Sequence, residues 1–276
     1  MTSNTAPMTR FTQEQIIRFW GGAVTHYTPQ TNIAEIHLTY RCNLCCVGCN
    51  RFCFLPPTTP DMTLDDARSF LRQALELKWC PVIYLIGGEP TLHKDMLDFV
   101  DIFSEASSEK IRIYSHYSDK RARRAVRQAE RLGKAEGVRW ARKPSGSMTH
   151  PVRDYHLAPC DLNCTRGPCH KHSGCHQEGC GISVDSMGYT VCCVGGAIDS
   201  VLGLGLRTKQ LSDLFDPEFA KWQTAELCRV CGAFLGVTPD RIAQAEKVHG
   251  VWMTPTWQEA VSRIEREQHH GNQNRI

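Results

Sequence analysis

The sequence predicts an α/β protein, an incomplete parallel (β/α) barrel of the TIM type followed by a small cysteine-rich domain. Between residues 33 and 142, short apolar runs alternate with stretches that carry an amphipathic helical pattern, which is typical of βα units around a parallel sheet. The segment 30–150 is too short for the eight units of a complete barrel. After Pro144 the chain becomes rich in Pro, Gly, His and Cys and loses its periodicity, which indicates a domain boundary near residue 150.

The βα units can be followed in order along the chain. Residues 64–78 place apolar side chains at intervals of three and four, and Thr63 is a suitable N-cap for that helix. Residues 82–86 (VIYLI) are wholly apolar, as a buried parallel strand requires. The same reasoning predicts strands at 33–40, 82–86, 111–117 and 138–142 and helices at 64–78, 93–106 and 119–132. We expect one or two further strands of the barrel to come from later in the chain.

The barrel is expected to span residues 30–150, and we expect three further segments outside it. These are an N-terminal extension with a helix at 1–29, the cysteine-rich domain at 151–268 and a flexible tail at 269–276. Residues 182–193 read as a hairpin that turns at Asp185–Gly188. The glycines at 195–205 lack the spacing of a dinucleotide-binding fingerprint and are expected to form a loop. Helical patterns return at 211–225, 239–248 and 256–267.

The fifteen cysteines are the unusual feature of the composition. An odd number cannot pair completely in disulfides, and the first 30 residues lack the apolar core of a signal peptide, so metal binding is the better explanation. No stretch approaches the roughly 18 uninterrupted apolar residues of a membrane span. A formal net charge of +3 in 276 residues gives no global case for nucleic-acid binding. We therefore expect a cytoplasmic metal-binding protein without a membrane partner.

Three cysteines follow the first predicted strand with the spacing C-x3-C-x2-C, namely Cys42, Cys46 and Cys49. Three thiolates on one loop can hold three irons of a [4Fe–4S] cluster and leave the fourth iron open for a ligand. The second predicted strand is followed directly by Gly87-Gly88-Glu89-Pro90. Together these motifs resemble the radical S-adenosylmethionine (SAM) superfamily, in which a GGEP motif occupies this place.

The resemblance implies a chemistry and a set of cofactor contacts. The open iron binds the amino and carboxylate groups of SAM, and the backbone of Gly87, Gly88, Glu89 and Pro90 meets the amino group. An electron from a flavodoxin- or ferredoxin-type donor lets the cluster cleave SAM to methionine and a 5′-deoxyadenosyl radical, which abstracts a substrate hydrogen. At the ends of the later strands, Ser115 or His116 is expected to reach the ribose of SAM and Arg142 its carboxylate, with Arg139 and Lys143 as alternatives to Arg142.

The first cysteine group departs from the superfamily pattern in two ways. Gly48 stands where the family usually has an aromatic residue before the last cysteine, so adenine packing is assigned to Phe52 or Phe54. Cys45 and Cys53 are additional, and we interpret them as thiols that do not bind the cluster. The residues give no basis for naming a catalytic acid or base.

The second cysteine group resembles the auxiliary-cluster domains of radical SAM enzymes, called SPASM in the longer form and twitch in the shorter. Gly188 lies between Cys175 and Cys193 in the pattern C-x12-G-x4-C, and Cys228 and Cys231 form a C-x2-C pair. The resemblance implies that these four cysteines, Cys175, Cys193, Cys228 and Cys231, hold an auxiliary [4Fe–4S] cluster. No cysteine follows Cys231, so the twitch form fits better. Several alternatives stay open: Cys180 competes with Cys175, Cys192 competes with Cys193, and a second auxiliary cluster would use Cys160, Cys164 and Cys169.

The predicted function is therefore a radical SAM enzyme that oxidises, cross-links or otherwise modifies a peptide or small-molecule substrate. The competing hypothesis is a non-enzymatic module in which zinc holds the cysteines and the basic segment 119–143 meets nucleic acid. The GGEP match argues against that module. Arg121, Arg124, Arg127 and Arg131 lie opposite the apolar stripe of their helix, so we interpret the basic segment as a solvated outer face.

Overall fold

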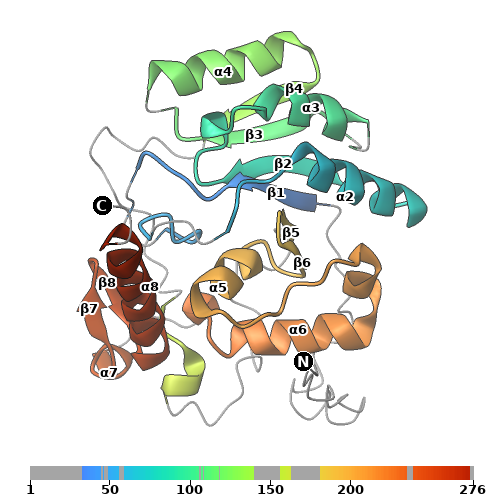
Figure 1. The fold of residues 1–276 in the computed structure, drawn as a ribbon. Coiled ribbons are helices and arrows are strands. Elements are labelled where there is room, and N and C mark those ends of the chain that lie inside the picture. The colour runs from blue at the N-terminus through green and yellow to red at the C-terminus, as the bar shows by residue number, and fades with distance from the viewer. Residues whose placement is uncertain are drawn as a thin grey trace.

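The computed structural model describes residues 33–44, 46, 49–55, 59–105, 107, 109–117, 119–139, 156–162, 181–234 and 239–273. Its centre is a six-stranded sheet with the order β4-β3-β2-β1-β5-β6 (Figure 1). Neighbouring strands from β4 to β5 are parallel, and β6 is antiparallel to β5. The strands are β1 Ile33–Thr39, β2 Val82–Gly87, β3 Ile111–Ser115, β4 Ala135–Arg139, β5 Ile182–Asp185, β6 Gly188–Thr190, β7 Glu246–Val248 and β8 Val251–Met253. The α-helices are α2 Leu64–Glu76, α3 Met96–Ser104, α4 Lys120–Arg131, α5 Gly195–Leu202, α6 Pro217–Cys228, α7 Pro239–Ile242 and α8 Pro255–Gln273.

This architecture confirms a mixed α/β fold with a mostly parallel sheet, consistent with a partial barrel. Helices α2 and α3 pack on the sheet and bury the first hydrophobic core, in which Ile36, Phe70 and Phe99 are fully buried. Helix α2 begins where the sequence predicts, because Thr63 and Asp66 form a capping box across its first turn. Helices α5 and α6 lie beside β6, while α7, α8 and the β7–β8 pair form a separate group at the left of Figure 1. In the described part of the chain, no helix is long and apolar enough to span a bilayer.

The predicted hairpin exists and joins the main sheet. Its first strand, β5, pairs in parallel with β1, so the sheet continues with strands from late in the chain. This confirms the expectation of later strands, and it places residues of the predicted 151–268 domain in the same sheet as the 30–150 segment. The boundary near residue 150, the 1–29 extension and the end of the 269–276 tail lie outside the described residues.

Four predicted elements have different bounds in the structure. The predicted helix 211–225 is divided into a 3-10 helix over Leu211–Phe215 and helix α6, which begins at Pro217. Strand β4 occupies Ala135–Arg139 rather than 138–142, because it pairs with β3 directly after the turn at Gly133. The predicted helix 93–106 is shorter in the structure, where α3 spans Met96–Ser104 and follows a 3-10 turn over Pro90–Leu92. The predicted helix 239–248 ends early at Ile242, since β7 pairs with β8 across a His249–Gly250 turn with positive φ at both residues.

The predicted loop at 195–205 is wrong, because its first half is helix α5. A Cβ added at Gly196 would lie 2.7 Å from Oδ2 of Asp185 and 2.9 Å from Oγ of Ser183. Glycine therefore allows the first turn of α5 to approach β5 closely. The helix then ends at Gly203, which has φ = +68°.

Candidate active site

The turn after β2, residues 87–90 (the GGEP turn), is pressed against the chain that leaves β1. Gly88 donates its backbone N–H to the carbonyl oxygen of Thr39 at 2.7 Å, and Glu89 donates to that of Arg41 at 2.9 Å. Gly87 has φ = +124°, a conformation that favours glycine. A Cβ added at Gly88 would lie 2.1 Å from the carbonyl oxygen of Arg41. This close approach places the GGEP turn at the start of the segment 42–53, which we call the first cysteine loop.

Glu89 is buried and ties the end of β2 to the end of β3. Its Oε1 accepts hydrogen bonds from the backbone N–H and the hydroxyl of Thr91 at 3.2 and 2.6 Å, and its Oε2 accepts from the backbone N–H of His116 at 3.0 Å. Nε2 of His116 also lies 3.0 Å from Oε2. Burial alone would raise the pKa of Glu89, but the hydrogen bonds and charge of His116 and the hydroxyl of Thr91 outweigh it and lower the pKa. The carboxylate of Glu89 therefore orders the GGEP turn.

His116 continues this connection to the first cysteine loop. Its Nε2 lies 2.7 Å from Oδ1 of Asn43, and Nδ2 of Asn43 donates to Oδ2 of Asp119 at 2.8 Å. Oδ1 of Asp119 accepts the backbone N–H of Ala122 at 2.7 Å and so caps helix α4. Asn43 thereby joins the first cysteine loop, the end of β3 and the N-terminus of α4.

Two of the residues predicted to contact SAM through its ribose or carboxylate lie at this edge of the sheet. His116 contacts Glu89 and Asn43 through hydrogen bonds, as described above. Ser115 is 1% exposed, and its Oγ accepts the backbone N–H of Tyr117 at 3.1 Å. Arg142 and Lys143 lie outside the described residues.

The three predicted cluster ligands lie within electrostatic range of one another. Burial raises the pKa of the Cys42 thiol to about 11, and the charges of Cys49, Glu89 and Cys46 add to the rise. The backbone turns between two of the ligands, since Cys49 donates its N–H to the carbonyl oxygen of Cys46 at 3.2 Å. Across the described ranges, no three side chains of His, Cys, Asp or Glu are arranged to hold a metal ion. Three thiols on one loop nevertheless fit an iron–sulfur cluster in number and chemistry.

Cys53, one of the two additional thiols of the loop, contacts Cys49. A hydrogen bond from the Cys53 thiol is the largest cause of a pKa lowered to about 6 at Cys49, which burial opposes. The same hydrogen bond, together with burial, raises the pKa of Cys53. Cys45 lies outside the described residues. That neither thiol binds the cluster stays a prediction.

Phe52 is enclosed in a second hydrophobic core. It is 2% exposed, and its ring centroid lies 4.8 Å from that of Trp257 and 5.1 Å from that of His156. Such a side chain has no free face for an adenine, so the assignment of adenine packing to Phe52 is wrong. Phe54 is only partly buried and contacts His156 and His249. Phe54 remains the candidate of the two.

Two described cysteines of the second group belong to the same core. Cys193 and Cys231 are buried in it, and Cys228 is partly exposed at the end of α6. The turn between Cys228 and Cys231 is held from two sides, since Nε1 of Trp257 donates to the carbonyl oxygen of Val230 at 2.7 Å and the backbone N–H of Cys160 donates to that of Arg229 at 3.0 Å. Outside the described residues lie the other cysteines of the group, Cys164, Cys169, Cys175 and Cys180.

A buried ion pair that the sequence patterns did not predict lies inside the barrel. Arg51 of the first cysteine loop pairs with Glu35 of β1, and both side chains are less than 10% exposed. Burial raises the pKa of Glu35 to about 7 against the opposing charge of Arg51, and the nearby charge of Cys192 adds to the rise. Burial also lowers the pKa of His37, two residues along β1, as do the charges of Arg51 and Arg207. Polar residues alternating with apolar ones in 33–39 were the available signal for this polar inner face.

A second missed network fixes the root of the first cysteine loop. The guanidinium of Arg207 donates to Oδ2 of Asp185 at 2.8 Å and to Oδ2 of Asp199 at 2.6 Å. The hydroxyl of Tyr40 donates to the same Oδ2 of Asp185 at 2.9 Å. Tyr40 is therefore tied to β5 and α5 two residues before the loop begins.

Comparison with known proteins gives little beyond this geometry. No protein-family model matches the chain, and no curated protein matches it. Two solved structures of BtrN share its general arrangement at 15% sequence identity. A selenomethionine form in an open conformation covers 76% of this chain and 89% of its own length with a TM-score of 0.44. A complex with AdoMet and 2-DOIA covers 80% and 98% with a TM-score of 0.47. Similarity at this level carries no inference about activity.

Proposed function

We propose that this chain is a radical SAM enzyme with its active site at the carboxyl edge of the parallel sheet. The observation that supports the proposal most directly is the hydrogen bonding of the GGEP turn to Thr39 and Arg41. It brings two motifs separated by more than 30 residues to one place, beside Cys42. Parallel α/β proteins bind their ligands at this edge of the sheet.

The residues of the site divide into ligands and supports. Cys42, Cys46 and Cys49 hold a [4Fe–4S] cluster, and the GGEP backbone receives the amino group of SAM. Ser115 or His116 serves the ribose and Arg142 the carboxylate. When bound, the cluster and SAM supply a 5′-deoxyadenosyl radical that removes a hydrogen atom from the substrate.

The supporting residues connect the GGEP turn and the first cysteine loop to the sheet. Glu89 and His116 lock the GGEP turn to β3, and Asn43 locks the first cysteine loop to His116. Arg51 anchors the far side of the loop on Glu35. A loop fixed on both sides presents its thiols in one geometry, which is the preorganisation that a cofactor site requires.

We also propose a twitch-like auxiliary [4Fe–4S] cluster on Cys175, Cys193, Cys228 and Cys231. Its support is the burial of Cys193 and Cys231 in one core and the anchored turn that follows Cys228. Cys193 is buried in the same core as Cys231, whereas Cys192 is only partly buried against it, which favours Cys193 of the two as the ligand. The use of Cys180 in place of Cys175, and a second auxiliary cluster, remain alternatives.

The proposed reaction oxidises, cross-links or otherwise modifies a peptide or a small molecule, and a flavodoxin- or ferredoxin-type protein in the cytoplasm supplies the electron. The buried Glu35, His37 and Arg51 on the inner face of the barrel favour a substrate with hydrogen-bonding groups. Both substrate classes meet that requirement.

The test is anaerobic purification and reconstitution with iron and sulfide. We expect a brown protein with absorbance near roughly 400 nm and about eight irons per chain, or about twelve if two auxiliary clusters form. Reduction with SAM should release 5′-deoxyadenosine. Cys46→Ala should abolish that release and lower the iron content by about four atoms.

Cys80→Ala is the matched control, because Cys80 is exposed and lies far along the chain from both cysteine groups. It should change neither the iron content nor the release of 5′-deoxyadenosine. A colourless protein that contains zinc and no iron would refute the proposal and favour the zinc-binding module. An unchanged iron content in Cys46→Ala would refute the ligand assignment.

A further inference from the structure

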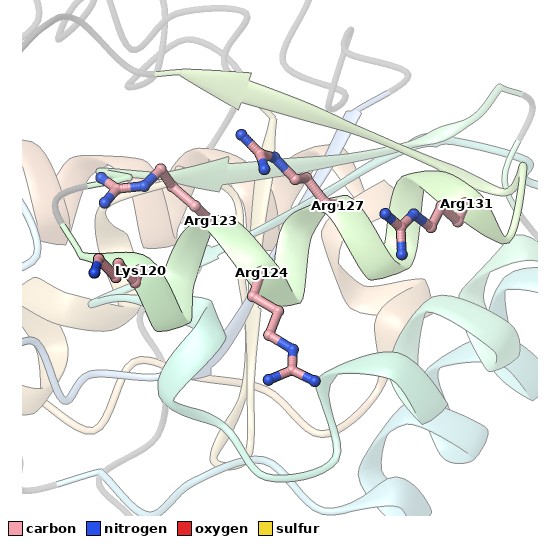
Figure 2. Close-up of a pocket in the computed structure, with 5 residues that line it drawn as sticks. All are labelled: Lys120, Arg123, Arg124, Arg127 and Arg131. Carbon is pink, nitrogen blue, oxygen red and sulfur yellow. The ribbon is translucent and has the colours of Figure 1, made fainter.

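Helix α4 carries an unbalanced row of positive charge. It contains Lys120 and five arginines against the single acid Glu130, whereas the neighbouring α2 carries two arginines and three acids. The apolar side of α4 is buried through Ala122, Val126 and Ala129. On its other side, five cations line a shallow pocket of about 300 Å³ and project from the same helix in Figure 2, namely Lys120, Arg123, Arg124, Arg127 and Arg131.

This charge is not neutralised within the described part of the chain. Lys120, Arg124, Arg127 and Arg131 form no ion pair with a described residue. Pairs such as Arg127 and Arg131 are four residues apart on one helix face, where like charges repel and destabilise the helix. A partner that supplies negative charge would remove that repulsion.

The basic row begins at the first cysteine loop. Asp119, the N-cap of α4, accepts the hydrogen bond from Asn43, which lies directly after Cys42. A molecule seated on the first turn of α4 therefore lies beside Asn43, the residue that follows the proposed ligand Cys42. No other helix in the described ranges combines this position with such a charge.

We propose that α4 is the docking surface for a small acidic electron-donor protein. The inference rests on the proposed function, because it supplies the one-electron reduction that the function needs. Arginine is enriched in protein interfaces and pairs with carboxylates through two parallel hydrogen bonds. Electron-transfer complexes are small and transient, so one helix of twelve residues offers enough contact for the charged centre of such an interface.

The distribution of charge favours an acidic protein over nucleic acid. The sequence pI is about 8.2, well below that of a typical nucleic-acid-binding domain, so the positive charge is local to α4. A compact acidic patch can meet the whole of this one helix of twelve residues.

The experiment compares two reductants of the reconstituted holoenzyme. Reduced flavodoxin, a small acidic flavoprotein, is the docking donor, and the methyl viologen radical cation is a small reductant that needs no docking surface. The test variant is Arg124→Glu/Arg127→Glu, and the control is Arg68→Glu/Arg72→Glu on α2, which changes the net charge equally. All four arginines lie on exposed or partly exposed helix positions, and glutamate is a good helix former, so both variants should fold.

We expect the test variant to raise the KM for flavodoxin by about tenfold or more and to lose the steep salt dependence of the wild type. Its rate with methyl viologen should stay unchanged, and the control should match the wild type with both reductants. Arg124→Lys/Arg127→Lys should retain most of the flavodoxin-dependent rate.

Two results would overturn the inference while leaving the proposed function intact. One is equal flavodoxin kinetics in the test and control variants. The other is unchanged flavodoxin kinetics combined with lost binding of a labelled single-stranded RNA, which would assign α4 to nucleic acid. Absence of 5′-deoxyadenosine with either reductant would instead refute the proposed function, and the docking role would fall with it.

Discussion

Glu89→Gln tests whether the buried carboxylate holds the active-site edge together. Glu89 is 1% exposed, and its Oε2 accepts the backbone N–H of His116. The amide group of Gln keeps one acceptor oxygen and places a donor where the second one was. Losing a charge-assisted hydrogen bond and leaving a buried N–H unsatisfied costs about 2–3 kcal/mol.

That free energy corresponds to a fall in Tm of roughly 4–12 °C for a chain of this size. The assay is thermal unfolding at pH 7 followed by far-UV circular dichroism, with exposed Glu76→Gln on α2 as the control. The pKa of Glu89 is lowered in the folded state, so its stabilisation is complete above the ordinary value of 4.5 and is lost as the pH falls through the folded-state pKa. The difference in Tm between wild type and Glu89→Gln should therefore shrink in acid. A Tm for Glu89→Gln equal to that of the control at pH 7 would refute the supporting role.

Three further substitutions test the packing around this edge. Gly88→Ala should destabilise the protein by about 3 kcal/mol or more, because the new Cβ would lie 2.1 Å from a backbone oxygen of Arg41. Urea unfolding would measure this loss of stability. An unfolding midpoint equal to that of the wild type would contradict the prediction. Arg207→Met should lower the free energy of unfolding by about 3–5 kcal/mol in the same assay, because Asp185 would stay buried without its cation. A smaller loss of stability than that caused by the same substitution at an exposed arginine would count against this prediction. Thr63→Ala should cost only about 1 kcal/mol through loss of the helix cap, and Thr63→Ser should restore it.

Local patterns predicted most of the barrel because each element is specified by nearby residues. The run 82–86 became β2, and the Thr63 cap fixed the start of α2. Helix α5 was missed because its first turn contains Gly195 and Gly196, which have low helix propensity. Their role depends on how closely α5 approaches Thr190 and Asp185, and no local pattern contains that information.

In the candidate site, too, features encoded by nearby residues were predicted, and features that depend on tertiary contacts were not. Cysteine spacing and the GGEP turn are local signals, and the structure brings Cys42 and Glu89 together as expected. The pairing of Arg51 with Glu35 is a tertiary contact across the barrel interior, and neither residue belongs to a motif. The adenine assignment to Phe52 failed for a related reason, since Phe52 is buried against Trp257, which lies 205 positions further along the chain (257 − 52).

The hydrogen bond between Tyr40 and Asp185 has a consequence for how the protein is made. The two residues are 145 positions apart, so the root of the first cysteine loop gains its anchor only after most of the chain has been synthesised. Contacts of such long sequence separation form late in folding because the intervening chain must first be closed into a loop. A ribosome-bound fragment that ends before β5 would carry Cys42, Cys46 and Cys49 with the contacts of Glu89, His116 and Arg51 but without the anchor of Tyr40 on Asp185. The last anchor of the first cysteine loop therefore forms only when the strand β5 has been synthesised.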